Sequence, residues 1–127
     1  DKEAFLFYVK AEKHLQEFKF IEAAEMLSFV REKYPNTSII PTAMLRECLL
    51  RMIIDDASIS LNIAKLLQET SLAPEGITAQ GEIYEKSYND IGKAMEMYNL
   101  LLEEYPMSML AEPVRIKIRK LNTIDKS

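Results

Sequence analysis

The segment Glu32-Lys33-Tyr34-Pro35-Asn36-Thr37 returns roughly 70 positions later as Glu103-Glu104-Tyr105-Pro106-Met107-Ser108. Because proline disfavours helical geometry in the residue before it, each copy predicts the end of a helix. Half of the separation between the two copies predicts a repeat unit of about 34 to 37 residues, with one further unit between the copies. The second helix of each unit then carries a recurring set of residues: Ala23, Leu27 and Val30, then Ala57, Leu61 and Ala64, then Ala94, Tyr98 and Leu101. The sequence therefore predicts three consecutive repeats.

Prolines and short polar turns divide the chain into seven predicted helices. We expect these helices at residues 2–17, 20–33, 40–54, 57–70, 74–87, 91–104 and 109–121. Asp55-Asp56 and Asn89-Asp90 are expected to cap the fourth and sixth of them. Residues 114–119 alternate apolar and basic side chains, as a strand would. However, the apolar residues of the last segment also form one helical stripe, so we predict a helix there.

The composition excludes several classes of protein. The 127 residues are 48% hydrophobic and 28% charged, which is the balance of one globular domain and not of a disordered tail. Three glycines and five prolines are too few for a sandwich or barrel of many short strands. The formal net charge of -4 argues against a nucleic-acid-binding function. Charged residues interrupt the longest apolar run, which argues against direct insertion into a membrane.

The sequence contains no residue pattern typical of an active site. His14 and Cys48 are the single histidine and the single cysteine, so neither has a like partner for a metal site or a disulfide. Each is expected to pack inside a helix pair, His14 with its hydrogen bonds satisfied. Gly76 and Gly81 have the spacing that begins a phosphate-binding loop, but Glu82 follows where lysine is required. We therefore expect no enzymatic activity and no cofactor.

The repeats resemble the tetratricopeptide repeat (TPR), a helix pair of about 34 residues. The residues that carry the resemblance are Phe7, Ala11, His14, Ala23, Leu27, Val30 and Pro35 in the first unit, and Gly81, Tyr84, Ala94, Tyr98, Leu101 and Pro106 in the third. The middle unit lacks the proline and the tyrosine. The resemblance implies an all-α, right-handed α-solenoid of three helix hairpins. The implied repeats are residues 4–37, 38–71 and 74–108, followed by a capping helix at 109–121, all in one domain of residues 1–127.

The segment Tyr105-Pro106-Met107-Ser108-Met109-Leu110-Ala111 is similar to a TPR sub-type of bacterial envelope proteins. That sub-type includes the outer-membrane assembly lipoprotein and the periplasmic coordinator of the Tol-Pal system. The resemblance implies a bacterial protein of the periplasm or cell envelope, with the cytoplasm as the alternative. The chain begins with Asp1 and not with Met, and we expect it to be a segment of a longer protein.

In TPR proteins the first helices of successive units line a concave groove, so the resemblance implies a scaffold that binds a peptide or partner protein there. The implied groove residues are Phe5, Tyr8, Glu12, Leu15, Thr42, Arg46, Leu49, Thr78, Glu82 and Glu85. A groove with an apolar end and an acidic end suits a peptide that carries apolar and basic groups. The family's carboxylate clamp has Lys and Asn where this chain has Tyr8, Glu12 and Thr42, so clamp binding is not expected. Alternatively, these residues are merely exposed or pack at the end of a short array.

Two other surfaces are candidates for contacts. Arg115, Lys117, Arg119 and Lys120 form a basic stripe that suits either an acidic partner or a solvated cap on the last helix. Phe5–Val9 are five consecutive apolar residues, more than one buried helix face needs. They predict a central first helix, an upstream element packed against it, or a homodimer. A structural spacer or self-association module is therefore the alternative function.

Overall fold

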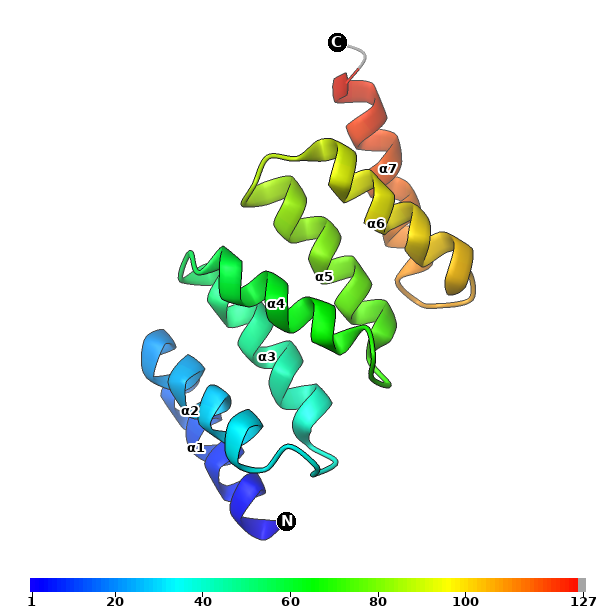
Figure 1. Cartoon of the computed structure of the whole chain (residues 1–127). Helices are drawn as coiled ribbons and strands as arrows, with labels where there is room; N and C mark the ends of the chain where they lie inside the picture. The colour runs from blue at the N-terminus through cyan, green and yellow to red at the C-terminus, as the bar shows by residue number, and fades with distance from the viewer. Residues whose placement is uncertain (126–127) are drawn as a thin grey trace.

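The computed structural model describes residues 1–125, which form seven α-helices and contain no strand (Figure 1). The helices are α1 (Lys2–Gln16), α2 (Phe20–Lys33), α3 (Ile40–Ile53), α4 (Ala57–Leu67), α5 (Ala73–Lys86), α6 (Ile91–Glu104) and α7 (Ala111–Asp125). The prediction of an all-α chain is confirmed. α4 ends three residues earlier than expected, and α7 lies further along the chain than predicted. Residues 126–127 of the predicted domain lie outside the described part.

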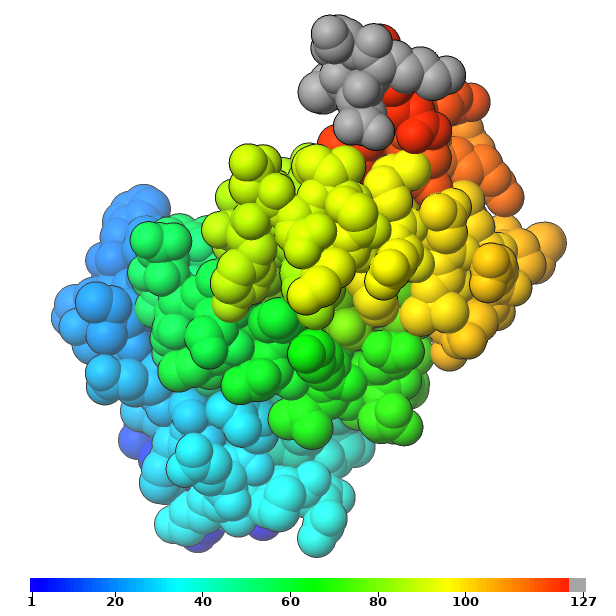
Figure 2. Space-filling model, turned by 45° about the horizontal axis from the view of Figure 1, so that its top comes forward, coloured from blue at the N-terminus to red at the C-terminus, as the bar shows by residue number. Residues whose placement is uncertain are grey.

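The helices follow one another along the long axis of the molecule, with α1 and α2 at one end and α7 at the other (Figure 1, Figure 2). Each helix packs against the next in sequence, and α3 also contacts α5. The turns after α1, α3 and α5 each contain a non-glycine residue with positive φ: Phe18, Asp55 and Asn89. Asn and Asp tolerate this left-handed conformation better than other residues with a side chain. The pairs α1–α2, α3–α4 and α5–α6 are therefore connected in the same way.

The second helix of each pair buries residues at spacings of four and three, but the structure corrects the predicted register of α4. The buried sets are Ala23, Leu27 and Val30 in α2, Ser60, Ala64 and Leu67 in α4, and Ala94, Tyr98 and Leu101 in α6. Ala57 and Leu61, which the repeat predicted in this place, are only half-buried. Ser60 substitutes for the expected alanine because its Oγ donates a hydrogen bond to the Cys48 carbonyl oxygen at 2.7 Å.

Small residues in the first helices let the two helices of a pair approach closely. Ala11, Cys48 and Gly81 occupy this place in α1, α3 and α5, and all three are buried. The contact is closest at Gly81, where an added Cβ would lie 2.3 Å from the ring of Tyr98. Tyr98 is completely buried, and its hydroxyl donates a hydrogen bond to Glu85 Oε1 at 2.8 Å. Glycine at position 81 is therefore what lets a tyrosine fill the α5–α6 pair.

The predicted cap of α6 is confirmed and that of α4 is not. The Lys93 backbone N–H donates to Asp90 Oδ1 at 3.0 Å, which satisfies one of the free N–H groups at the start of α6. Asp56 occupies the N-cap position of α4 but makes no capping hydrogen bond. Its carboxylate accepts a hydrogen bond from Arg51 instead, because a buried arginine of α3 lies beside it.

Replacing Gly81 with alanine tests the close contact in the α5–α6 pair. We expect Gly81→Ala to lower the free energy of unfolding by about 1–3 kcal/mol, because the new methyl group and the Tyr98 ring cannot occupy the same space. Urea unfolding followed by circular dichroism measures this change. Gly92→Ala is the matched control. Its Cβ would meet Asp90 Oδ1 at an ordinary 3.6 Å, so stability should stay equal or rise by up to about 1 kcal/mol. Equal stability of the two variants would contradict the proposed contact.

Candidate functional site

The candidate site is the surface to which α1, α3 and α5 contribute. At one end, Arg46 of α3 reaches across to α1, where its Nε donates to Glu12 Oε1 at 2.9 Å and its Nη2 to Oε2 at 3.3 Å. An interaction with the Tyr8 hydroxyl, followed by the charge of Glu12, raises the pKa of the Arg46 guanidinium. The structure thus brings three of the predicted groove residues together. Half of the Arg46 side chain stays exposed, so this ion pair is accessible to a partner.

Further along the same surface, α3 and α5 border an open cavity of about 170 Å³. It is lined by Leu45, Leu49, Glu75, Thr78, Ala79, Glu82 and Leu110. Leu49, Thr78 and Glu82 are predicted groove residues that meet here. The other four were not among the predicted groove residues, although helical spacing indicates two of them. Leu45 lies one turn before Leu49, and Glu75 lies one turn before Thr78 on the same face of α5.

The acidic end of the surface is connected to the basic stripe of α7. Lys117 Nζ lies 3.4 Å from Glu82 Oε1 and 3.8 Å from Glu85 Oε1. Glu85 also accepts the hydrogen bond from Tyr98, and burial together with this carboxylate raises the pKa of the Tyr98 hydroxyl. Lys117 therefore neutralises part of the acidic charge and joins α7 to α5.

The other basic residues of α7 face outward. Arg115 and Arg119 lie 3.2 and 3.7 Å from carboxylate oxygens of Glu112, on the same helix, and Lys120 is exposed. Among the remaining predicted groove residues, Phe5 and Thr42 are exposed, and Leu15 packs half-buried against the core of the α1–α2 pair. The predicted groove residues thus form two local groups, around Arg46 and around the α3–α5 cavity.

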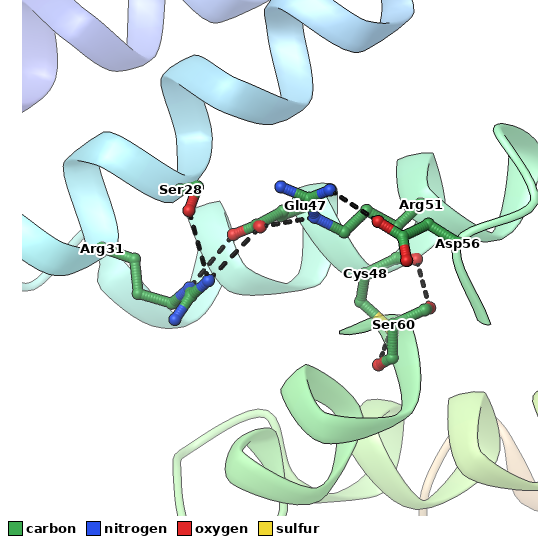
Figure 3. Close-up of polar contacts among 7 residues, drawn as sticks. All are labelled: Ser28, Arg31, Glu47, Cys48, Arg51, Asp56 and Ser60. Atoms are coloured by element: carbon green, nitrogen blue, oxygen red, sulfur yellow. Dashed lines mark hydrogen bonds and ion pairs between the residues drawn. The ribbon is translucent and has the colours of Figure 1, made fainter. Parts of the chain in front are cut away.

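A buried cluster of charges lies behind this surface, between α2 and α3 (Figure 3). Glu47 is completely buried, and its carboxylate accepts hydrogen bonds from Arg31 Nε at 3.0 Å and Arg51 Nε at 2.7 Å. Arg51 Nη1 donates to Asp56 Oδ2 at 2.9 Å. Burial alone would lower the pKa of Arg51, but the hydrogen bonds to Glu47 and Asp56 raise it. Since both oxygens of Glu47 are bonded to arginines, this carboxylate serves to join helices.

The sequence contained one signal for this cluster. Glu47 and Arg51 are four residues apart on α3, the spacing that lets an acid and a base pair on one helix. That spacing is also usual on exposed helix faces, so it does not predict burial. Arg31 belongs to another helix, and its approach to Glu47 depends on how α2 packs against α3. Only the structure shows that the pair is buried.

Cys48 lies in α3 and His14 in α1, and the two side chains have different surroundings. Cys48 is completely buried, its Sγ lies 3.4 Å from the Ser60 carbonyl oxygen, and burial raises the pKa of the thiol. His14 is half-buried, and its Nδ1 is buried without a hydrogen-bond partner among the described residues. The expectation that the hydrogen bonds of His14 are satisfied is therefore wrong for this atom. Within residues 1–125, no three His, Cys, Asp or Glu side chains converge as metal ligands would.

Comparison of the sequence with protein-family models and with curated proteins finds no match. None of the helices described for residues 1–125 combines the length and the apolar character needed to cross a bilayer.

Removal of the Glu47 carboxylate tests the buried charge cluster. We expect Glu47→Ala to lower the free energy of unfolding by roughly 3 kcal/mol, because the Nε groups of two largely buried arginines lose their acceptor. Glu12→Ala is the matched control, since it removes the same group from the exposed pair with Arg46 and should cost less than about 1 kcal/mol. Urea unfolding measures both changes. Similar losses of unfolding free energy in the two variants would show that burial of Glu47 does not increase the contribution of its ion pairs to stability.

The Cys48 thiol should be almost unreactive in the folded protein. Its raised pKa lowers the fraction of thiolate at pH 8, and its burial blocks the reagent. We expect Ellman's reagent to react on the order of 100-fold more slowly with the folded chain than with the chain in concentrated urea. The urea sample is the control, and it should give one thiol per chain. Rapid labelling without denaturant would contradict the buried position.

Proposed function

We propose that this chain is a non-catalytic, TPR-like scaffold that binds a peptide or partner protein on the concave surface of α1, α3 and α5. The proposed architecture is a right-handed α-solenoid of three helix hairpins, with α7 as the cap. Three features support it: sequential packing of the helices, equivalent turns at Phe18, Asp55 and Asn89, and the repeated buried sets of α2, α4 and α6. Its resemblance to TPR proteins of the bacterial envelope supports the same function.

The observation that carries this proposal is the cavity between α3 and α5. Leu45, Leu49 and Leu110 contribute apolar side chains to its lining, while Glu75 and Glu82 contribute carboxylates. Ligand pockets for drug-sized molecules typically measure about 300 to 1,000 Å³, so a cavity of about 170 Å³ is too small for one. It is large enough for a single apolar side chain. The chemistry therefore favours a peptide that anchors one apolar residue here and places Lys or Arg beside it.

The exposed pair of Glu12 and Arg46 extends the surface beyond the cavity. A peptide that continues towards α1 meets a carboxylate and a guanidinium that already bind each other. Charges of this kind steer a partner and set its direction more than they add affinity. We therefore propose that the cavity supplies most of the affinity and the Arg46 end supplies specificity.

Substitution at the cavity tests the proposed function. Peptides are selected from a random library displayed on phage, and their affinities for the purified chain are measured by fluorescence anisotropy. We expect selected peptides to share an apolar residue next to Lys or Arg. Leu49→Asp should weaken their binding about tenfold or more, because it puts a charge into the apolar part of the cavity lining.

Ile53→Asp is the matched control, because it makes the same change one turn further along α3 at a more exposed side chain outside the cavity lining. This variant should bind the peptides as the unmodified chain does. Failure to select any peptide, or equal binding by the two variants, would overturn the proposed groove. A spacer role would then be the better interpretation.

A further inference from the structure

Successive helix pairs are joined by a polar contact at an equivalent position. Between α2 and α3 this contact is Arg31 with Glu47, at 3.0 Å. Between α4 and α5 it is Gln80 Nε2, which donates to Gln68 Oε1 at 2.9 Å. Arg31 and Gln68 lie equally far along their helices from the buried Ala23 and Ser60, and Glu47 and Gln80 directly precede the buried Cys48 and Gly81. The two contacts are therefore equivalent, with complementary groups in both.

The same position between α6 and α7 is apolar. Leu102 stands at the place of Arg31 and Gln68, and Ile118 of α7 packs in the same apolar cluster. The α2–α3 and α4–α5 junctions thus use a charge pair and an amide pair, while the α6–α7 junction places apolar residues in one cluster. In each case the chemistry on one helix matches that of the helix packed against it. The residue at this position therefore indicates whether the helix packed against it presents a charged, an amide or an apolar side chain.

In α1 the equivalent residue is Lys10, which directly precedes the buried Ala11. No helix of the described chain packs on this side of α1, and Lys10 takes part in no ion pair among residues 1–125. Its Nζ lies 4.9 Å from the centroid of the Phe7 ring. Lys10 is thus a cation without a carboxylate partner among residues 1–125. It lies at the position through which α3 contacts α2 and α5 contacts α4.

An apolar hollow of about 420 Å³ adjoins Lys10. Leu6, Phe7, Val9 and Tyr34 contribute its apolar lining, and Lys33 lies beside it together with Lys10. Lys33 Nζ lies 5.6 Å from the Tyr34 ring and has no carboxylate partner in the described ion pairs either. The one carboxylate in the lining, Glu3, accepts a hydrogen bond from the Tyr34 hydroxyl at 2.8 Å. The hollow therefore combines apolar surface with two ammonium groups and suits an acidic, amphipathic ligand.

We propose that an amphipathic helix of a partner polypeptide packs on α1, as α2 packs on α3 and α4 on α5, with an Asp or Glu opposite Lys10. This inference is independent of the proposed function, because the hollow lies on the outer side of the first helix pair. The carboxylate of the partner occupies the place that Arg31 and Gln68 have in the two internal junctions. Its apolar side chains cover Leu6, which is 59% exposed, and Val9, which is 46% exposed.

The side-chain sizes at the junction define the partner helix further. One turn before Glu47 and Gln80, α3 and α5 have Ala43 and Gly76, and an added Cβ at Gly76 would lie 2.8 Å from Leu67 Cβ. In α1 this place belongs to Leu6. At this place α1 therefore has the larger side chain. A partner helix needs small residues opposite Leu6 to approach α1 as closely as α4 approaches α5. The place of Leu67 lies directly before that of Gln68, so we expect Ala or Gly directly before the acidic residue of the partner.

A second copy of this chain is a poorer occupant. A two-fold contact centred on Lys10 would bring two ammonium groups together, because an isologous interface places the same patch on both sides. Like charges at close range disfavour such a contact. An acidic helix meets no such repulsion.

The test uses a helical peptide based on α4, because α4 already packs on a first helix in this way. The probe comprises residues 57–72 with Leu67→Ala and a staple between positions 58 and 62, which are exposed in α4. One version carries Gln68→Glu and the other Gln68→Lys. Binding of each fluorescent peptide to the full chain is measured by anisotropy. We expect the Glu peptide to bind about tenfold more tightly than the Lys peptide.

The variant Lys10→Glu should reverse this preference, and Leu6→Asp should weaken both peptides. Lys10 is exposed, so its substitution leaves the fold intact, and circular dichroism verifies this. Lys120→Glu, at the opposite end of the molecule, is the matched charge control and should leave the preference unchanged. Leu49→Asp should also bind normally, which separates this surface from the proposed groove.

Equal binding of the two peptides, or an unchanged preference in Lys10→Glu, would overturn the proposal. Light scattering of the chain without peptide supplies a second criterion. A dimer that Leu6→Asp splits would show that a second copy occupies this face, and it would also overturn the proposal.

Discussion

The ring of Tyr98 lies against the backbone of Gly81, where even a methyl group would come within 2.3 Å of the ring. Small buried residues also lie in the other pairs. Ala11 and Ala23 of α1–α2 belong to one apolar cluster, and Ser60 of α4 is hydrogen-bonded to Cys48 of α3. Small residues at these places set how closely the two helices of a pair approach. The other features described here depend on that separation, because it determines which side chains of α1, α3 and α5 are left for the common surface.

The pairs are then joined by contacts that differ in chemistry at one shared position. A buried carboxylate is costly unless its oxygens are bonded, and Glu47 satisfies this requirement with Arg31 and Arg51. Gln80 makes an uncharged contact with Gln68, and Leu102 and Ile118 belong to one apolar cluster. A helix packed in a wrong order or register would separate these matched groups and leave polar atoms buried alone. The junctions therefore favour one order of the helices over others.

This order creates two surfaces of opposite character. Between α3 and α5 lies a small apolar cavity with acidic neighbours, while the free side of α1 combines apolar side chains with the ammonium groups of Lys10 and Lys33. The first surface suits basic partners and the second acidic ones. The cavity lies between α3 and α5 and the hollow lies on α1, and the two share no lining residue.

The sequence by itself determined the seven helices, because proline positions, turn residues and helical stripes are local features that do not depend on distant contacts. Of the groove residues that the resemblance implied, Leu49, Thr78 and Glu82 line the α3–α5 cavity and Tyr8, Glu12 and Arg46 lie together, while their role in binding stays a prediction. The register of α4 was misassigned, because Ala57 matched the pattern by residue type while Ser60 satisfied its hydroxyl only through contact with Cys48. Burial of Glu47, the pairing of Lys117 with Glu82 and the unpartnered face of Lys10 were decided by the tertiary structure alone. Each depends on the approach of two helices, and local sequence carries no information about which groups from distant segments will meet there.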